Sequence, residues 1–160
     1  MNDGSVRKLQ ISKQAMAELD AHACATYPDE CCGMIIERNG QEEVVRITNI
    51  QNELHARDAI QFPRTAATAY AMRYQEVEPI FEAAYKGHIR LHAVYHSHPE
   101  HDAYFSEEDR AAALGWIDDP SYAAAGQIVL SIRNRAVVGA KGFGWDETNQ
   151  TYLEIPLAIV

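Results

Sequence analysis

The feature that most constrains the fold is the apolar segment IRLHAVYHSH, residues 89–98, which Pro99 terminates. Its length and its β-branched and aromatic residues are typical of a strand that is covered on both faces, as a central strand is. Its end is polar, because Ser97 lies between His96 and His98. The segment therefore predicts a sheet with helices on each face, and it leaves two imidazoles at a strand end, where sites in such sheets tend to lie.

Cap and turn residues mark where further elements begin and end. Asn39-Gly40 separates two β-branched runs and predicts a hairpin with a tight turn. Ser12 is suited to cap a helix that ends near Ala25, and Ser106 is suited to cap a short helix that ends near Trp116. Further strands are expected at residues 8–12, 32–38, 42–50, 59–62, 126–133, 136–145 and 151–159.

The middle of the chain predicts a long helix. Apolar residues recur at helical spacing between residues 65 and 85, Pro79 predicts a kink or a break within this helix, and Gly87 is suited to end it. Helices and strands are thus interleaved along the chain, which is typical of an α/β or mixed α+β protein. Because no repeat, low-complexity tract or linker divides the chain, we expect residues 1–160 to form a single domain.

Composition narrows the environment and the partners. With 47% hydrophobic residues the chain can bury a core, and its net charge of −9 at pH 7 speaks against nucleic acid as a partner. No apolar run is long enough to cross a bilayer, and the N-terminal residues lack the apolar core of a secretory signal. We therefore expect a cytoplasmic protein with no nucleic-acid partner and no membrane partner.

The cysteines, Cys24, Cys31 and Cys32, are expected to be reduced and buried thiols. An odd number of cysteines in a chain without an export signal speaks against a disulfide framework. Because no C-x-x-C pair occurs, a structural zinc site built from cysteines is not expected either.

Potential metal ligands are concentrated in residues 96–109, HSHPEHDAYFSEED. Side chains alternate along a strand, so His96 and His98 leave from the same face, and two imidazoles held in this way suit zinc. Asp109 lies in the first turn of the helix that Ser106 is expected to cap, from where its carboxylate can turn back and supply a third ligand. Three protein ligands leave a fourth position for water, which is typical of a catalytic zinc site.

Hydrolysis at such a site needs further groups. Zinc lowers the pKa of bound water to roughly 7, but a proton acceptor and an oxyanion donor are still required. The Ser106 hydroxyl is the local candidate donor, and Glu30, just before the second strand, is the candidate proton acceptor. His101 is expected to be an exposed loop residue, because a fourth protein ligand would close the site. Competing glutamates, which strand and turn positions suit as solvated groups, are Glu37, Glu42 and Glu43.

These residues resemble those of a known family. His96-Ser97-His98-Pro99, then six residues, then Ser106-x-x-Asp109, with Glu30 upstream, resembles the JAMM motif of the JAB/MPN metalloproteases. The segment PDECCG, residues 28–33, is similar to the segment that carries the glutamate in small bacterial and archaeal members. The resemblance runs over nearly the whole chain.

The resemblance implies a fold and a set of roles. The family fold is a curved mixed β-sheet flanked by helices, similar to the cytidine deaminase core. By this resemblance His96, His98 and Asp109 would bind Zn2+, Glu30 would be the general acid and base, and Ser106 would stabilise the tetrahedral intermediate.

The implied activity is hydrolysis of a peptide or isopeptide bond at the C-terminus of a ubiquitin-like protein. Small prokaryotic members act on ubiquitin-like sulfur carriers that end in Gly-Gly, and some remove a C-terminal cysteine or another extension. The first alternative is a deconjugating isopeptidase that acts on protein conjugates. A second is a non-catalytic scaffold, although such members typically lose zinc ligands. A deaminase is disfavoured because the P-C-x-x-C segment is missing. The oligomeric state stays open, and a homodimer is one assembly that the sequence allows.

Overall fold

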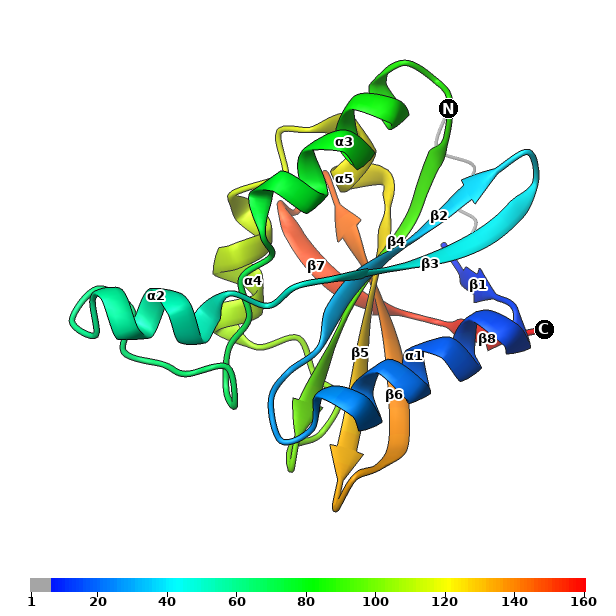
Figure 1. Cartoon of the computed structure of the whole chain (residues 1–160). Helices are drawn as coiled ribbons and strands as arrows, with labels where there is room; N and C mark the ends of the chain where they lie inside the picture. The colour runs from blue at the N-terminus through cyan, green and yellow to red at the C-terminus, as the bar shows by residue number, and fades with distance from the viewer. Residues whose placement is uncertain (1–6) are drawn as a thin grey trace.

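The computed structural model describes residues 7–160, which form a six-stranded mixed sheet, a two-stranded ribbon and five helices (Figure 1). The large sheet has the strand order β3-β2-β4-β5-β6-β7, in which only β4 and β5 are parallel. The ribbon pairs β1 with β8 in parallel. The strands are β1 (Leu9–Ile11), β2 (Cys32–Arg38), β3 (Gln41–Ile47), β4 (Arg90–Pro99), β5 (Gly126–Arg133), β6 (Ala136–Asp146), β7 (Thr151–Ile155) and β8 (Leu157–Ile159).

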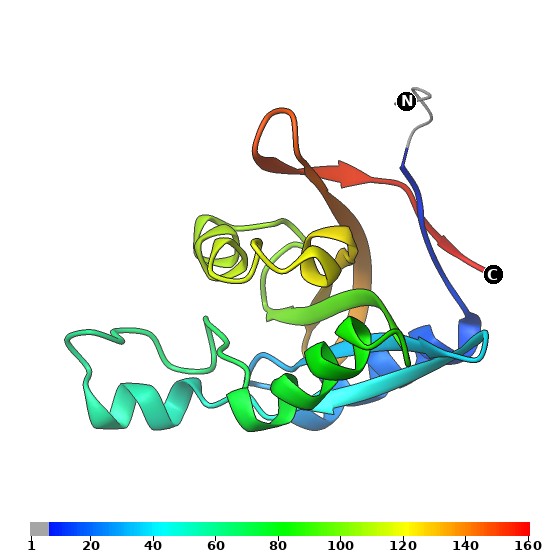
Figure 2. The ribbon, with the colours of Figure 1, turned by 90° about the horizontal axis from the view of Figure 1, so that it is seen from above.

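Helices cover both faces of the large sheet (Figures 1 and 2). On one face, α1 and the β1-β8 ribbon bury a core that includes Leu19, Tyr95 and Leu130. On the other face, α3, α4 and α5 bury a second core that includes Met34 and Val94. The helices are α1 (Lys13–Thr26), α2 (Gln51–Arg57), α3 (Tyr74–Tyr85), α4 (Glu107–Leu114) and α5 (Pro120–Ala124). The predicted mixed α/β class and the central, doubly covered position of β4 are confirmed.

Several local predictions are confirmed by backbone geometry. Asn39 and Gly40 both have positive φ angles, 53° and 77°, as a tight hairpin turn requires. Ser12 caps α1 by accepting a hydrogen bond from the Ala15 amide at 3.0 Å. The predicted last strand is divided at Pro156 into β7 and β8, which lie in different sheets.

The strand expected at residues 59–62 is wrong, because these residues form a turn after α2, a helix that the sequence analysis did not anticipate. The side chain of Asp58 accepts hydrogen bonds from the amides of Ile60 and Gln61, at 3.1 and 3.0 Å. These amides are therefore not available to a strand ladder, and α2 with its loop extends away from the sheet (Figures 1 and 2).

The long helix predicted for residues 65–85 is only half correct. α3 begins at Tyr74, continues through Pro79 without a break and ends before Gly87, whose φ is 77°. The preceding segment is held in a non-helical path by Asn49, whose side chain donates to the Ala69 carbonyl at 3.2 Å and accepts from the Ala71 amide at 3.0 Å. A side chain distant in sequence thus overrides the helical pattern.

The cysteines are free thiols, as expected, although only Cys31 and Cys32 are buried, whereas Cys24 is partly exposed. Burial raises the pKa of Cys31 to about 11. This thiol therefore stays protonated at neutral pH. No helix among residues 7–160 is long and apolar enough to cross a membrane.

The contact between β2 and β4 depends on a glycine. A Cβ atom built on Gly33 would lie 2.5 Å from the ring of Tyr95. Tyr95 is fully buried, and its hydroxyl lies 2.7 Å from Nδ1 of His22 on α1. The ring is therefore fixed over Gly33, which keeps the strand that leads out of the Glu30 segment close to β4.

We predict that Gly33→Ala lowers the free energy of unfolding by about 1–3 kcal/mol, because the added methyl group overpacks against the Tyr95 ring. The matched control is Gly139→Ala in β6, where an added Cβ would meet no heavy atom of the described chain within 4 Å. Chemical denaturation of both variants provides the measurement. Equal stability of the two variants would contradict the account of this contact.

Candidate metal centre

The end of β4 brings two imidazoles together on the face that α3, α4 and α5 cover. Nε2 of His96 and Nε2 of His98 are 3.1 Å apart. His96 is fully buried and His98 is 6% exposed. The shared orientation expected from strand alternation is therefore observed, in surroundings that exclude most water.

Asp109 joins this pair from the first turn of α4. Its Oδ2 atom lies 3.1 Å from Nε2 of His96 and 3.0 Å from Nε2 of His98. The carboxylate is turned back by a capping box in which the Ser106 amide donates to Oδ2 at 3.0 Å and the Asp109 amide donates to the Ser106 hydroxyl oxygen at 3.1 Å. The cap that starts α4 therefore also aims Asp109 at the end of β4.

The three donor atoms fit a zinc ion. In a tetrahedral site with Zn–N and Zn–O distances of about 2.0–2.1 Å, neighbouring donors are separated by roughly 3.3 Å, close to the 3.0–3.1 Å seen here. Two imidazole nitrogens and a carboxylate oxygen are also ligand types that zinc prefers. Facing lone pairs at this distance repel one another, and a cation between them replaces the repulsion with attraction.

Hydrogen bonding fixes the tautomer of one imidazole. Nδ1 of His98 lies 2.9 Å from the carbonyl oxygen of Asp102, which can only accept, so Nδ1 carries the proton. The Nε2 atom of neutral His98 therefore presents a lone pair to the site. Tyr70 stacks on the ring of His96 with centroids 4.5 Å apart and planes inclined by 25°, which holds this second imidazole in place.

The electrostatics of the site favour ligand forms that can bind a cation. Burial lowers the pKa of His96, which keeps the imidazole neutral. Burial alone would also lower the pKa of His98, but its contact with Asp109 raises it, so a cation that binds there would displace a proton from His98. Burial alone would raise the pKa of Asp109, but its contacts with His96 and His98 and the hydrogen bond from the Ser106 amide lower it well below its usual range. Asp109 is therefore an anion between two imidazoles, as metal binding requires.

Glu30 lies beside the imidazole pair. One ligand atom each of Glu30, His96 and His98 fall within 4.8 Å of one another. Glu30 is 4% exposed, and its Oε1 has no hydrogen-bond partner among residues 7–160. Burial raises the pKa of Glu30 to about 8. The carboxyl group is close enough to reach an ion or a water molecule next to the imidazoles.

The backbone around Glu30 is fixed by contacts that the sequence analysis did not identify. The Glu30 amide donates to the Ala66 carbonyl at 2.8 Å, and the Asn49 side chain donates to the Glu30 carbonyl at 3.0 Å. The next amide, that of Cys31, donates to the hydroxyl of Ser97 at 2.8 Å. Ser97 lies in the histidine motif, so its place near the site could be predicted from the sequence. No local pattern predicts that Asn49 or Tyr70 would reach the site.

The competing glutamates lie elsewhere. Oε1 of Glu37 is 2.7 Å from Nη2 of Arg90, and Oε2 of Glu42 accepts from the Ser12 amide at 3.1 Å. A ligand atom of each and one of His92 form a separate group within 4.8 Å. In that group the guanidinium of Arg90 already neutralises the Glu37 carboxylate, which makes it a poorer ligand for a metal ion.

A cleft with a volume of about 160 Å³ opens over the candidate centre. Nη2 of Arg64 and Oε1 of Glu108, 2.8 Å apart, join its two sides, and both side chains are about half exposed. His101 lies exposed at the cleft, as expected for a loop residue. The lining residues are Glu30, Arg64, Thr68, His98, His101, Tyr104, Ser106, Glu108 and Asp109.

The fold and the site together define a mixed-sheet domain with a two-histidine, one-aspartate centre at the end of its central strand. A family model described as prokaryotic homologs of the JAB domain matches residues 12–138, most of the chain. The chain therefore belongs to this family of prokaryotic JAB domain homologs. A search of curated proteins gave no match.

Solved structures share the fold. A protein from Desulfitobacterium hafniense is 21% identical, with a TM-score of 0.66 and coverage of 95% of this chain and 92% of that one. A protein from Salinibacter ruber is 18% identical, with a TM-score of 0.54 and coverage of 95% and 91%. A JAB1/MPN domain protein from Archaeoglobus fulgidus is 13% identical, with a TM-score of 0.50 and coverage of 94% and 99%. These similarities show that the chain has the JAB/MPN fold.

The buried carboxyl of Glu30 leads to a prediction about stability. Its pKa rises from an ordinary value of 4.5 to about 8 on folding, so the folded state loses stability as the pH rises through this window. Glu30→Gln replaces the carboxyl with an amide that does not ionise, so the variant does not lose this stability as the pH rises. In protein stripped of metal with a chelator, we expect the stability of Glu30→Gln relative to wild type to grow with pH between pH 6 and 8, by up to about 1.4 kcal/mol per unit.

Denaturant titrations at pH 6, 7 and 8 measure this difference. Glu43→Gln is the matched control, because it makes the same chemical change at an exposed position on β3. A Glu30→Gln difference that is the same at pH 6 and pH 8 would show that the carboxyl is not held in a desolvated position.

Proposed function

We propose that the chain is a zinc metallopeptidase of the cytoplasm that hydrolyses a peptide or isopeptide bond at the C-terminus of a ubiquitin-like sulfur carrier. In this proposal it removes a C-terminal cysteine or another extension that follows Gly-Gly. The observation that carries the proposal is the convergence of three donor atoms within 3.1 Å beside a buried glutamate whose Oε1 has no partner among residues 7–160. Membership of a family with JAB domains supports it.

His96, His98 and Asp109 would hold the ion, through the atoms that already face one another. Bound there, zinc would supply a Lewis acid that lowers the pKa of water and polarises the substrate carbonyl. Asp109 would contribute a negative charge and both imidazoles would bind the ion in their neutral forms, so the protein ligands would neutralise only half of the charge of a divalent ion. The remaining positive charge favours the developing oxyanion.

Glu30 is proposed to move the proton. Its unpartnered Oε1 can accept a proton from the attacking water and deliver it to the nitrogen of the leaving amine. Without metal, burial raises the pKa of Glu30 to about 8, and the positive charge of a bound zinc ion would lower it toward neutral pH, the range that suits a group that must both take up and release a proton. Hydrogen bonds to its amide and its carbonyl fix the backbone from which the carboxyl extends toward the imidazoles.

Ser106 is proposed to stabilise the tetrahedral intermediate. Its hydroxyl oxygen accepts a hydrogen bond from the Asp109 amide, so its own proton stays free to be donated. The side chain lines the cleft together with Glu30 and Asp109. A hydroxyl that is already fixed as a helix cap needs little reorganisation to donate to an oxyanion.

A glycine tail fits the cleft. The narrow volume of about 160 Å³ and the charged side chains around it suit extended backbone better than bulky apolar side chains. The Arg64–Glu108 pair is half exposed, and such pairs contribute little, so a substrate can displace it at small cost. The same features fit a deconjugating isopeptidase, which is the second candidate. A non-catalytic scaffold is the third, and the presence of the complete donor set argues against it.

The test uses zinc-loaded protein and Gly-Gly carriers of two kinds, one extended by a C-terminal cysteine and one joined to a lysine side chain. Mass spectrometry should show loss of the extension and release of a carrier that ends in Gly-Gly. Glu30→Gln should retain one zinc per chain and turn over at least about 100-fold more slowly, since general acid–base catalysis contributes 10²–10⁴-fold. Glu43→Gln serves as the control with normal turnover.

Cleavage of the lysine conjugate alone would favour the deconjugating isopeptidase. Retention of zinc with no cleavage of either carrier would favour the scaffold. Normal turnover by Glu30→Gln would remove Glu30 from the proposed role.

A further inference from the structure

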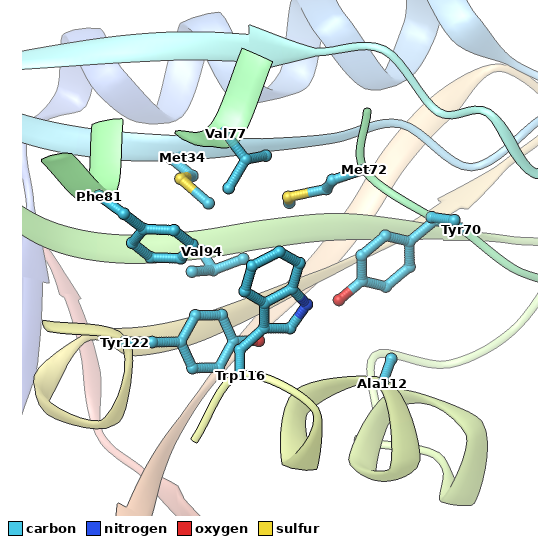
Figure 3. A pocket seen from close by; sticks show the side chains of 10 residues that line it. Met34, Tyr70, Met72, Val77, Phe81, Val94, Ala112, Trp116 and Tyr122 are labelled. Carbon is cyan, nitrogen blue, oxygen red and sulfur yellow. The ribbon is translucent and has the colours of Figure 1, made fainter. Parts of the chain in front are cut away.

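A second cavity lies on the same face of the sheet as the candidate metal centre. It has a volume of about 200 Å³, and Met34 of β2 and Val94 of β4 are among the side chains that line it (Figure 3). No charged side chain among residues 7–160 lines it. Its walls are mainly four aromatic rings and two thioethers, from Tyr70, Phe81, Trp116, Tyr122, Met34 and Met72.

The same two segments of the chain line the cavity and the cleft over the metal centre. One side of both spaces is the segment of residues 64–72, which contributes Arg64 to the cleft and Tyr70 to the cavity. The other side of both is α4 and the residues after it, which contribute Asp109 to the cleft and Ala112 to the cavity. Asp109 and Ala112 are three residues apart on α4, so they lie on one face of the helix with a rise of about 4.5 Å.

Tyr70 is the boundary between the two spaces. One face of its ring stacks on His96, with centroids 4.5 Å apart, and its hydroxyl points toward the indole of Trp116 at the cavity (Figure 3). The thickness of this one ring therefore separates His96 from the cavity, so the two sites are neighbours on the same face of the sheet.

The lining fits an apolar group the size of a ring or a branched side chain. An apolar cavity of about 150 Å³ is enough to bind benzene, and this one is larger. The aromatic rings supply a large apolar contact area, and the flexible thioethers adapt to apolar groups of different shape. Trp116 and Phe81 are only partly buried, and Ala112 is exposed at the rim, so the space is open to solvent.

We propose that this cavity receives an apolar, ring-sized side chain from the residue that follows the scissile bond. The inference rests on the proposed function, because it concerns the bond cleaved at the metal centre. The glycines before that bond have no side chains to place and match the narrow polar cleft. The apolar cavity then serves the leaving group, and a leucine or phenylalanine fills it better than a cysteine does.

The first experiment tests the cavity without hydrolysis. Toluene is titrated into protein labelled with ¹³C at the methionine methyl groups, with and without zinc. The signals of Met34 and Met72 should shift to saturation, whereas that of Met16 on α1 should not. Ala112→Phe should abolish the shifts by filling the mouth. Ala111→Phe is the matched control, because Ala111 is equally exposed on α4 but does not line the cavity.

The second experiment compares carriers that end in Gly-Gly-Phe, Gly-Gly-Leu and Gly-Gly-Ala. Wild type and Ala111→Phe should cleave the phenylalanine and leucine extensions with kcat/KM at least about tenfold higher than the alanine extension, as expected for several added carbon atoms in an apolar pocket. Ala112→Phe should bring this ratio close to one.

Toluene that leaves Met34 and Met72 unchanged, or equal kcat/KM values for the three extensions in wild type, would overturn the inference. Saturable toluene binding with no cleavage of any extension would contradict the proposed function and would still support the cavity as a site for apolar rings.

Discussion

The Oδ2 atom of Asp109 is the point at which the end of β4 and the start of α4 meet. It accepts a hydrogen bond from the Ser106 amide and lies within 3.1 Å of both imidazoles. An N-terminal cap stabilises a helix by about 1 kcal/mol, whereas burying a carboxylate costs several kcal/mol unless opposite charge compensates it. The cap alone therefore does not explain why a carboxylate is buried here, but a cation shared with the two histidines does.

Glu30 is a second buried carboxyl whose burial costs free energy that its own hydrogen bonds do not compensate. Its backbone is fixed by the Ala66 carbonyl and by the side chains of Asn49 and Ser97, while its Oε1 has no partner in the described chain. A buried carboxyl held in this way lowers the stability of the folded protein at neutral pH. Sites that perform proton transfer commonly accept such a loss, because a shifted pKa and a fixed position are what the chemistry needs.

Much of the candidate site could be predicted from the sequence because its ligands depend on local rules. Alternation along a strand places His96 and His98 on one face, and a helix cap aims Asp109 toward them. The sequence predicted the central strand and the hairpin at Asn39-Gly40 for the same reason. The features that the sequence did not predict depend on hydrogen bonds between residues that are far apart in the chain.

The segment of residues 65–73 illustrates this limit. Its periodicity is helical, but the Asn49 side chain holds it in another path, by donating a hydrogen bond to the Ala69 carbonyl and accepting one from the Ala71 amide, 22 residues away. That path brings Tyr70 onto His96 and forms one side of both the cleft and the apolar cavity. Likewise Ser97 reaches the Cys31 amide across 66 residues. No propensity or spacing rule contains these contacts, since tertiary context overrides local preference.

The most direct test of the central claim is X-ray absorption spectroscopy at the zinc edge of the zinc-loaded protein. If His96, His98 and Asp109 hold the ion, the spectrum should show one zinc with about four nitrogen and oxygen neighbours at roughly 2.0–2.1 Å, including two imidazoles. Cys32 pairs with His96 across the β2–β4 ladder, so a sulfur neighbour at roughly 2.3 Å is the informative alternative. A sulfur neighbour, or a protein that does not retain zinc, would contradict the account.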